Sequence, residues 1–352
     1  MSTWEANVRK VVPYTPGEQP KERTYVKLNT NENPYPPSPK VEAAALSFDA
    51  LRLYPDPTAS DLVHAIAEYH GVSDKRVFVG VGSDDVLAMA FMTFFHSGKK
   101  ILFPDITYSF YDVWADMLEI PFETIPLTGD YRIDPADYAR ECGGIVFPNP
   151  NAPTGIALPI EDVRSIISKN PNVVVIVDEA YIDFGGTSAL TLLDEFENLL
   201  VVRTFSKSRS MAGLRIGYAI GSEKMIAYLN DVKYSYNSYT MNRPSIIYGV
   251  ESIRDDAYFK ETVDKVIKTR EAFAEAIRKA GYTVLPSSAN FVFASHPTIP
   301  AKEIFARSKE AGFLVRYFDK PRIDNFLRIS IGTDEEMRAY ADFLCEIKSF
   351  DL

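Results

Sequence analysis

Short runs of consecutive apolar residues alternate with longer, helix-like segments between about residue 60 and residue 245. Two of the helix-like segments are DDVLAMAFMTFF (84–95) and PIEDVRSIISKN (159–170). Runs that are apolar at every position are typical of strands buried on both faces, so the pattern predicts an α/β layer with a mostly parallel sheet between helices. The apolar runs are RVFVG (76–80), KKILF (99–103), CGGIVF (142–147), NVVVIVD (172–178), NLLVVRT (198–204) and RIGYAI (215–220).

The chain divides into three regions by pattern. Residues 1–40 are rich in Pro, Asn and Thr, which predicts an extended arm and not a helix. Residues 41–245 form the predicted large domain, and residues 246–352 a smaller α+β domain. The smaller domain is expected to contain a helical stretch (250–280), YTVL (282–285), NFVFA (290–294), a helix (301–311), LVRYF (314–318), FLRIS (326–330) and a final helix (334–348).

Composition excludes several classes of protein. The formal net charge of −10 gives no basic footprint for nucleic acid. The two cysteines, far apart in the chain, support no disulfide framework and fit a reducing compartment, so we expect a cytoplasmic protein. The opening MSTWEANVRK has no apolar segment of a signal peptide, and no apolar run is long enough for a membrane span. The four histidines lack the spacing of metal ligands, so no metal is expected.

The chemistry-bearing residues follow the apolar runs, where an open parallel sheet binds its ligands. Ser83 and Asp84 are expected to begin a helix directly after Gly82, and such a helix start can bind phosphate. A plain strand-to-helix turn, with Ser83 or Asp84 as the N-cap, has the same sequence pattern. Tyr108, after the second run, can stack on a planar ligand or simply pack. The dinucleotide-binding glycine pattern fails, because Asp85 stands where its third glycine should be.

A carboxylate and a lysine follow two other runs. Asp178 ends a wholly apolar strand, where a buried acid needs a partner, unless it only caps a helix. Lys207 comes soon after the next run, and partial burial of a lysine there favours the free, nucleophilic amine. Arg215 follows as a possible phosphate partner. Together these groups suit pyridoxal 5'-phosphate (PLP), which needs an amine, a carboxylate for its ring nitrogen, an aromatic neighbour and a phosphate site.

Nearly the whole chain resembles the fold-type I aminotransferases of the aspartate-aminotransferase superfamily, and within them the histidinol-phosphate aminotransferase family. The most specific motifs together are the TFSK…GLRIGYAIG block and VDEAY, while KLNTNENPY and PYTPG narrow the match to the histidinol-phosphate branch. The matching segments are VRKVVPYTPGEQP (8–20), KLNTNENPYPPSP (27–39), LRLYPDP (51–57), GVGSDD (80–85), FPDITYSFY (103–111), NPNAPTG (149–155), VDEAYIDF (177–184), TFSKSRSMAGLRIGYAIG (204–221) and FLRISIGT (326–333).

The resemblance implies a fold, an assembly and roles for matching residues. The expected fold is a large domain with a mixed, mostly parallel seven-stranded sheet, a small C-terminal domain and the N-terminal arm. Lys207 would form the Schiff base, Asp178 would pair with the pyridine nitrogen, and Tyr181 would bond the phenolic oxygen of the cofactor. The protein would be a homodimer with shared active sites, because Tyr54 would reach the cofactor phosphate of the other subunit. The remaining roles would be phosphate binding by Ser83, Asp84, Ser206 and Arg215, ring stacking by Tyr108, binding of the substrates' anionic end by Arg328, and substrate-side contacts from Tyr14, Asn33 and Arg316.

One position departs from the family pattern. The family commonly has an asparagine just before the second proline of P-N-N-P-T-G, and that asparagine bonds the phenolic oxygen. This chain has Ala152 there, and the neighbouring Asn151 takes over only if the turn is shifted. Otherwise Tyr181 holds that oxygen with less help.

The resemblance implies transfer of the amino group of L-histidinol phosphate to 2-oxoglutarate, in histidine biosynthesis. Threonine-phosphate decarboxylase and aromatic amino-acid aminotransferase are the nearest alternatives, and both would keep Lys207. A PLP-fold domain that binds its ligand only for regulation is a third, disfavoured by the presence of Lys207, Asp178 and Arg328 together. A nicotinamide-dependent dehydrogenase is disfavoured by the broken glycine pattern.

Overall fold

The computed structural model describes residues 7–21 and 23–347, and its largest element is a seven-stranded sheet. Its strands are β2 (Val77–Gly80), β3 (Ile101–Pro104), β4 (Phe122–Ile125), β5 (Gly144–Pro148), β6 (Val175–Asp178), β7 (Leu199–Thr204) and β8 (Gly217–Ile220). They lie in the order β2-β8-β7-β6-β5-β3-β4, and all neighbours are parallel except that β8 is antiparallel to β2 and β7. The predicted mostly parallel seven-stranded sheet is therefore confirmed.

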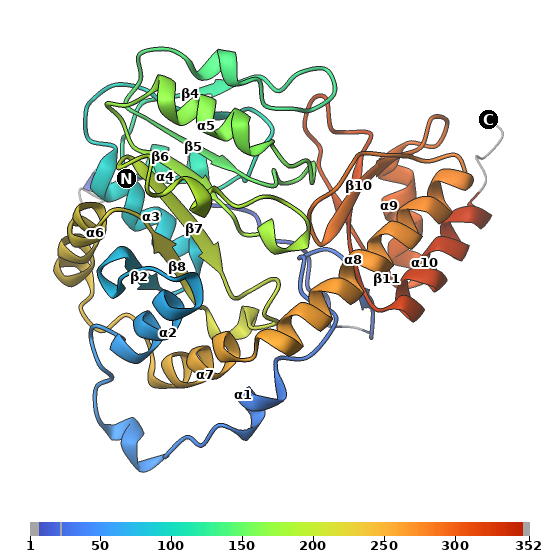
Figure 1. Ribbon diagram of the computed structural model, residues 1–352. Helices are drawn as coiled ribbons and strands as arrows, with labels where there is room; N and C mark the ends of the chain where they lie inside the picture. The colour runs from blue at the N-terminus through green and yellow to red at the C-terminus, as the bar shows by residue number, and fades with distance from the viewer. Residues whose placement is uncertain (1–6, 22, 348–352) are drawn as a thin grey trace.

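Helices cover both faces of this sheet (Figure 1). Alternate strand residues point to opposite faces, so Val175 and Val177 pack with one group of helices while Ile176 packs with the other. One group consists of α2 (Ser60–His70), α5 (Ile160–Lys169) and α7 (Arg243–Arg254), and the other of α3 (Ser83–Phe94), α4 (Tyr111–Met117) and α6 (Glu223–Tyr236). This three-layer packing explains why the inner strands are apolar at most positions.

The C-terminal part of the chain forms a second, smaller layer. Its antiparallel sheet has the order β12-β13-β10-β9, with strands β9 (Thr283–Val284), β10 (Phe291–Ser295), β12 (Arg316–Tyr317) and β13 (Leu327–Ser330). The helices are α8 (Asp256–Lys279), α9 (Ala301–Ala311) and α10 (Asp334–Glu346), and the start of α10 is fixed by a capping box between Thr333 and Glu336. The long helix α8 runs from beside α7 to the small sheet (Figure 1).

The predicted domain boundary between residues 245 and 246 falls inside α7. That helix packs closely on α2, because a Cβ at Gly249 would lie 2.8 Å from the Leu62 side chain. We propose that the two domains meet at Asp255, which separates α7 from α8 within the expected helical stretch of residues 250–280.

The described part of the N-terminal arm is mostly extended and contacts both domains. Its short strand β1 (Val26–Lys27) pairs in parallel with β11 (Phe313–Leu314) of the small domain, and Tyr14 stacks on Phe110 of the large domain. Beyond the arm, α1 (Pro39–Ala43) leads into an exposed loop. The 3-10 turns are η2 (Asp49–Arg52), η3 (Asp74–Arg76), η4 (Pro135–Tyr138), η5 (Ile182–Phe184), η6 (Ala189–Leu192) and η7 (Ala212–Leu214). Within residues 7–21 and 23–347, none of the helices combines the length and apolarity needed to cross a membrane.

Candidate active site

A pocket opens where β5, β6 and β7 end and α3 begins, and β7 points from there toward the small domain (Figure 1). Eight of the residues singled out in the sequence line it, although they come from four separate segments of the chain. The pocket is lined by Ser83, Asp84, Tyr108, Pro148, Ala152, Asp178, Ala180, Tyr181, Thr204, Ser206, Lys207 and Arg215. The rule that ligands bind at the carboxyl ends of parallel strands thus locates this pocket from sequence.

One corner of the pocket is suited to an anion. The first residues of the twelve-residue helix α3 present backbone N–H groups there, beside the Arg215 guanidinium, which lies 3.0 Å from the Asp84 carboxylate. Gly82 has φ +85, and a Cβ there would lie 2.6 Å from Arg215 Nη2. A Cβ at Gly217 would lie 2.3 Å from the backbone of Gly82 and Ser83. Gly217 is therefore needed for the close packing of β8 against this turn, and Gly82 for the positive φ of the turn itself.

Asp178 lies at the bottom of the pocket and is buried. Its carboxylate accepts hydrogen bonds from the Tyr111 hydroxyl at 3.0 Å and from the Ala180 backbone N–H at 3.2 Å. Within the described chain, no lysine or arginine forms an ion pair with it, and burial raises the pKa of Asp178 to about 6. A buried carboxylate held only by neutral donors would be stabilised by a cationic ligand group such as a protonated ring nitrogen.

Tyr111 is a site residue that the sequence analysis missed. It is fully buried, and burial together with Asp178 raises the pKa of its hydroxyl well above the ordinary value, so that it remains a hydrogen-bond donor. Tyr111 lies three residues after Tyr108 in the segment that had been singled out for an aromatic. Tyr108 itself donates to Asp84 at 2.7 Å.

Lys207 lies just beyond β7, half-buried, and its Nζ donates to the Thr30 carbonyl of the arm at 3.1 Å. The same Nζ lies 5.8 Å from the ring centroid of Tyr181. The arm therefore covers the lysine, and the amine faces the pocket that contains Asp178 and Tyr181.

The turn of residues 149–155 places Ala152, not Asn151, against the pocket. The side-chain amide of Asn151 is buried and donates to the Ile106 carbonyl at 3.0 Å and to Thr154 Oγ1 at 3.1 Å. These bonds hold the turn against the segment that follows β3. The structure thus does not bring Asn151 into the place of the missing family asparagine.

Arg328 is the expected substrate-side residue that binds the anionic end of the substrates. Arg328 on β13 is half-buried, and its Nη2 donates to the Asn29 carbonyl at 2.9 Å. Its Nε is buried and has no hydrogen-bond partner in the described chain. Burial lowers the pKa of Arg328 from its ordinary value. An unpaired buried guanidinium N–H favours an anionic partner.

The other three expected substrate-side residues lie along the arm, and Tyr54, expected at the cofactor phosphate of the other subunit, lies in the exposed loop. Arg316 donates to the carbonyls of Thr15 and Pro16 and so fixes the arm next to Tyr14. Asn33 donates to the Ser208 carbonyl at 3.2 Å, beside Lys207. Tyr54 is 78% exposed and stacks on Tyr239, away from the pocket of its own chain.

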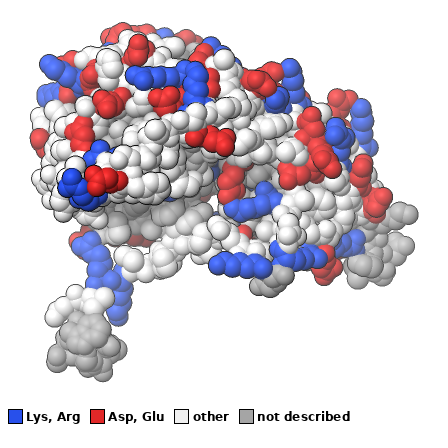
Figure 2. Space-filling view, turned by 90° about the horizontal axis from the view of Figure 1, so that it is seen from below, with Lys and Arg blue, Asp and Glu red and all other residues white. Residues whose placement is uncertain are grey.

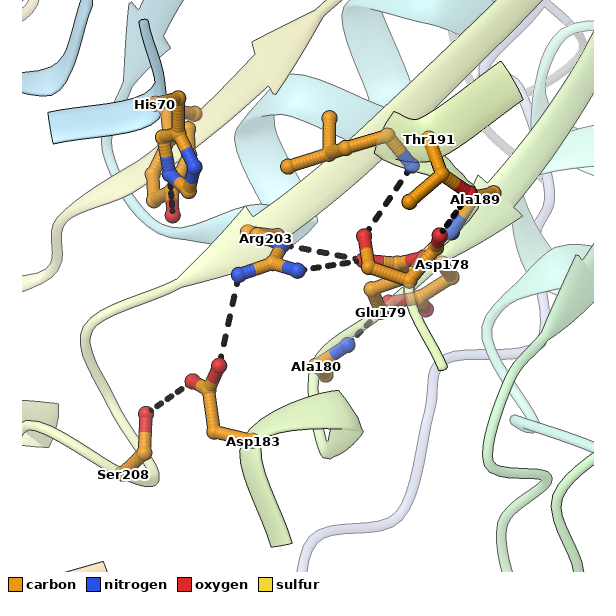
Figure 3. Close-up of polar contacts among 12 residues, drawn as sticks. His70, Asp178, Glu179, Ala180, Asp183, Ala189, Thr191, Arg203 and Ser208 are labelled. Carbon is orange, nitrogen blue, oxygen red and sulfur yellow. Dashed lines mark hydrogen bonds and ion pairs between the residues drawn. The ribbon is translucent and has the colours of Figure 1, made fainter. Parts of the chain in front are cut away.

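A buried charge network lies behind the pocket (Figure 3). Arg203 pairs with Glu179 at 2.8 Å and with Asp183 at 3.3 Å, and Ser208 Oγ donates to Asp183 at 2.6 Å. The network ties the ends of β6 and β7 to the loop that carries Lys207. Glu179 is paired within the protein, whereas the adjacent Asp178 faces the pocket.

A model of the family described as aminotransferase class I and II matches residues 23–344. The chain belongs to the class I and II aminotransferases. The resemblance that the sequence motifs indicated is therefore confirmed.

The histidinol-phosphate aminotransferase of Clostridium acetobutylicum is 52% identical to this aminotransferase over 345 residues, covering 97% of this chain and 98% of the relative. Histidinol-phosphate aminotransferase 1 of Hydrogenovibrio crunogenus is also 52% identical, over 347 residues, with the same coverage. Among solved structures, the histidinol-phosphate aminotransferase of Sinorhizobium meliloti in complex with pyridoxal-5'-phosphate has a TM-score of 0.82 at 25% identity, covering 92% of this chain and 91% of that one.

Proposed function

We propose that this aminotransferase transfers the amino group of L-histidinol phosphate to 2-oxoglutarate, giving imidazole acetol phosphate and L-glutamate in histidine biosynthesis. The observation that carries the proposal is the pocket that combines Lys207, Asp178 and the anion corner in a chain 52% identical to enzymes of that name. Arg328 supports it, because its free Nε can bind the anionic end that both substrates carry.

The residues of the pocket fit pyridoxal 5'-phosphate. Asp178, a buried carboxylate with only neutral donors, would hold the ring nitrogen, and the helix start at Ser83 with Ser206 and Arg215 would hold the phosphate. When bound, the cofactor supplies a reactive aldehyde and an electron-withdrawing ring. The Tyr108 side chain, beside Asp84, would lie against that ring.

The protein's own groups divide the remaining work. Lys207 would supply the amine that holds the cofactor and, once released, would take the proton from Cα of the substrate. Asp178 would keep the ring nitrogen of the bound cofactor protonated, and the Tyr181 hydroxyl would donate to its phenolic oxygen. Because the amino group is stored between the two half-reactions, we expect ping-pong kinetics.

A homodimer with shared sites belongs to the proposal. The loop that follows α1 exposes large apolar side chains to an extent unusual for a monomer: Phe48 is 82% and Tyr54 is 78% exposed. This loop projects at the lower left of Figure 1, and Figure 2, seen from that side, shows wide uncharged areas between the charged side chains. Burial of this loop against a second copy would bring Tyr54 to the partner's phosphate corner.

We also propose a cytoplasmic location, because the two cysteines, Cys142 and Cys345, are unpaired, as is usual in a reducing compartment.

An amino-donor panel tests the reaction. The purified, PLP-loaded protein is given L-histidinol phosphate, L-phenylalanine or L-threonine phosphate with 2-oxoglutarate, and both L-glutamate and CO2 are measured. We expect the highest kcat/KM with histidinol phosphate and no CO2. Preferential release of CO2 from threonine phosphate, or a higher kcat/KM with phenylalanine, would replace the proposal with the corresponding alternative.

A further inference from the structure

Asn31 of the arm is a buried residue with every polar group engaged. The residue is 1% exposed, and its backbone has φ +58, which asparagine tolerates better than most residues. Its backbone N–H donates to Ser330 Oγ at 2.9 Å, and its carbonyl accepts from Asn290 at 2.9 Å. The side-chain amide lies between Ser330 Oγ at 2.8 Å and the Tyr181 hydroxyl at 2.9 Å.

The direction of these hydrogen bonds follows from the one donor that cannot be reversed. The Asn31 backbone N–H must donate, so Ser330 Oγ accepts it and directs its single proton to Asn31 Oδ1. The Asn31 Nδ2 then faces Tyr181 and donates to its hydroxyl oxygen. In the flipped amide, the buried Ser330 proton would lose this acceptor and Tyr181 would donate its own proton to Asn31.

We propose that Asn31 is a positioning residue that makes Tyr181 a hydrogen-bond donor toward the phenolic oxygen of the cofactor. The inference rests on the proposed function and extends it to a residue of the arm. Tyr181 has one proton, and the bond from Asn31 leaves that proton free to point into the pocket. The Tyr181 proton matters more in this chain than in the family pattern. Ala152 lies where the family has a second donor to the same oxygen, and the Asn151 amide is turned away from the pocket.

The pKa read from the absorbance of the bound cofactor reports this hydrogen bond directly. A donor to the phenolic oxygen stabilises its charged form and so lowers that pKa. Asn31→Asp keeps the size of the side chain and the bond from Ser330, but its second oxygen in the ionised form only accepts, so Tyr181 turns its proton away. We expect the spectroscopic pKa to rise by about one, a tenfold change in proton affinity. Asn31→Gly, which also suits φ +58, should raise it by less.

The Tyr181→Phe background separates a positioning role from a general electrostatic one. We expect the single variant Tyr181→Phe to raise the spectroscopic pKa of the bound cofactor. The double variant with Asn31→Asp should show little further rise. Asn29→Asp is the matched control, because it adds the same charge two residues away while the Asn29 amide faces the Glu18 carbonyl and not Tyr181.

Two results would overturn the inference. One is an unchanged pKa in both Asn31 variants with cofactor bound, and the other is an equal rise with and without the Tyr181 hydroxyl. A wild-type protein that binds no cofactor would instead refute the proposed function, so the two failures are distinguishable.

Discussion

Replacement of Asp178 by asparagine tests the centre of the proposed site. The side chain keeps its size and can still accept a hydrogen bond from Tyr111 or Ala180, so the fold should persist. What is lost is the negative charge that would face the ring nitrogen of the bound cofactor. Burial raises the pKa of Asp178 from 3.8 to about 6, which corresponds to roughly 3 kcal/mol of destabilised charge that a cationic ring nitrogen can offset.

The expected loss of rate follows from that figure. Breaking a buried charge pair by removal of one partner costs about 3–5 kcal/mol, so kcat should fall by roughly 10²- to 10⁴-fold. The assay combines steady-state transamination with the absorbance of the bound cofactor, so that the rate is expressed per cofactor-loaded protein.

Glu179→Gln is the matched control, because it removes the neighbouring buried carboxylate that pairs with Arg203 outside the pocket (Figure 3). We expect it to lower the free energy of unfolding by roughly 3 kcal/mol with little change in kcat of the loaded enzyme. If Asp178→Asn with cofactor bound turns over within tenfold of the wild type, or if both variants lose the same activity, the reasoning about Asp178 is wrong.

Three further changes have definite expected outcomes. Burial lowers the pKa of His70 from 6.5 to about 3, so its stabilising contribution is complete above pH 6.5 and declines as the pH falls from 6.5 to 3. The His70→Gln variant should therefore remove roughly 2 kcal/mol of the difference in urea-unfolding free energy between pH 7 and pH 5, and an unaltered difference would exclude His70 as its source. Gly217→Ala should weaken cofactor binding at least tenfold in an absorbance titration, since its Cβ would lie 2.3 Å from the Gly82–Ser83 backbone; an unchanged Kd would show that the turn can move without consequence. Arg328→Lys should raise KM for 2-oxoglutarate by about tenfold or more, with a smaller effect on kcat, because a lysine cannot bind a carboxylate through two parallel N–H groups; a kcat effect alone would place Arg328 outside substrate binding.

The large sheet was predictable because its strands are buried on both faces. β6 and β7 appear in the sequence as uninterrupted apolar runs, and Asp178 and Lys207 follow them within a few residues. β4 was not found among the apolar runs, because it is an edge strand whose residues Phe122–Thr124 are partly or fully exposed and whose apolar character is broken by Glu123.

Elements set by long-range pairing could not be read from local pattern. The run LVRYF (314–318) is divided between β11, which pairs in parallel with the arm, and β12, which pairs antiparallel with β13. Val315 lies between them, and nothing in the run itself indicates that the two halves have different partners.

The same limit applies to the site. Asn31 acts through Ser330 and Tyr181, which lie 299 and 150 residues away in sequence, and a single asparagine in a loop gives no sign of such partners. Asn151 was a reasonable candidate from sequence, but its side-chain amide donates to the Ile106 carbonyl and does not line the pocket. Tyr111 could have been identified from the same segment as Tyr108, because both tyrosines follow the second apolar run.

The tight packing of β8 against the Gly82–Ser83 turn divides the site into two mechanical halves. Backbone meets backbone there, so the anion corner is part of the large sheet and cannot shift without it. Arg328 belongs to β13 of the small domain. With the roles proposed above for Arg328 and the anion corner, a rotation of the small domain would change the distance between the two anchors while the anion corner stays fixed to the large sheet. The length of the bound substrate would then set the domain angle at which both anchors are engaged.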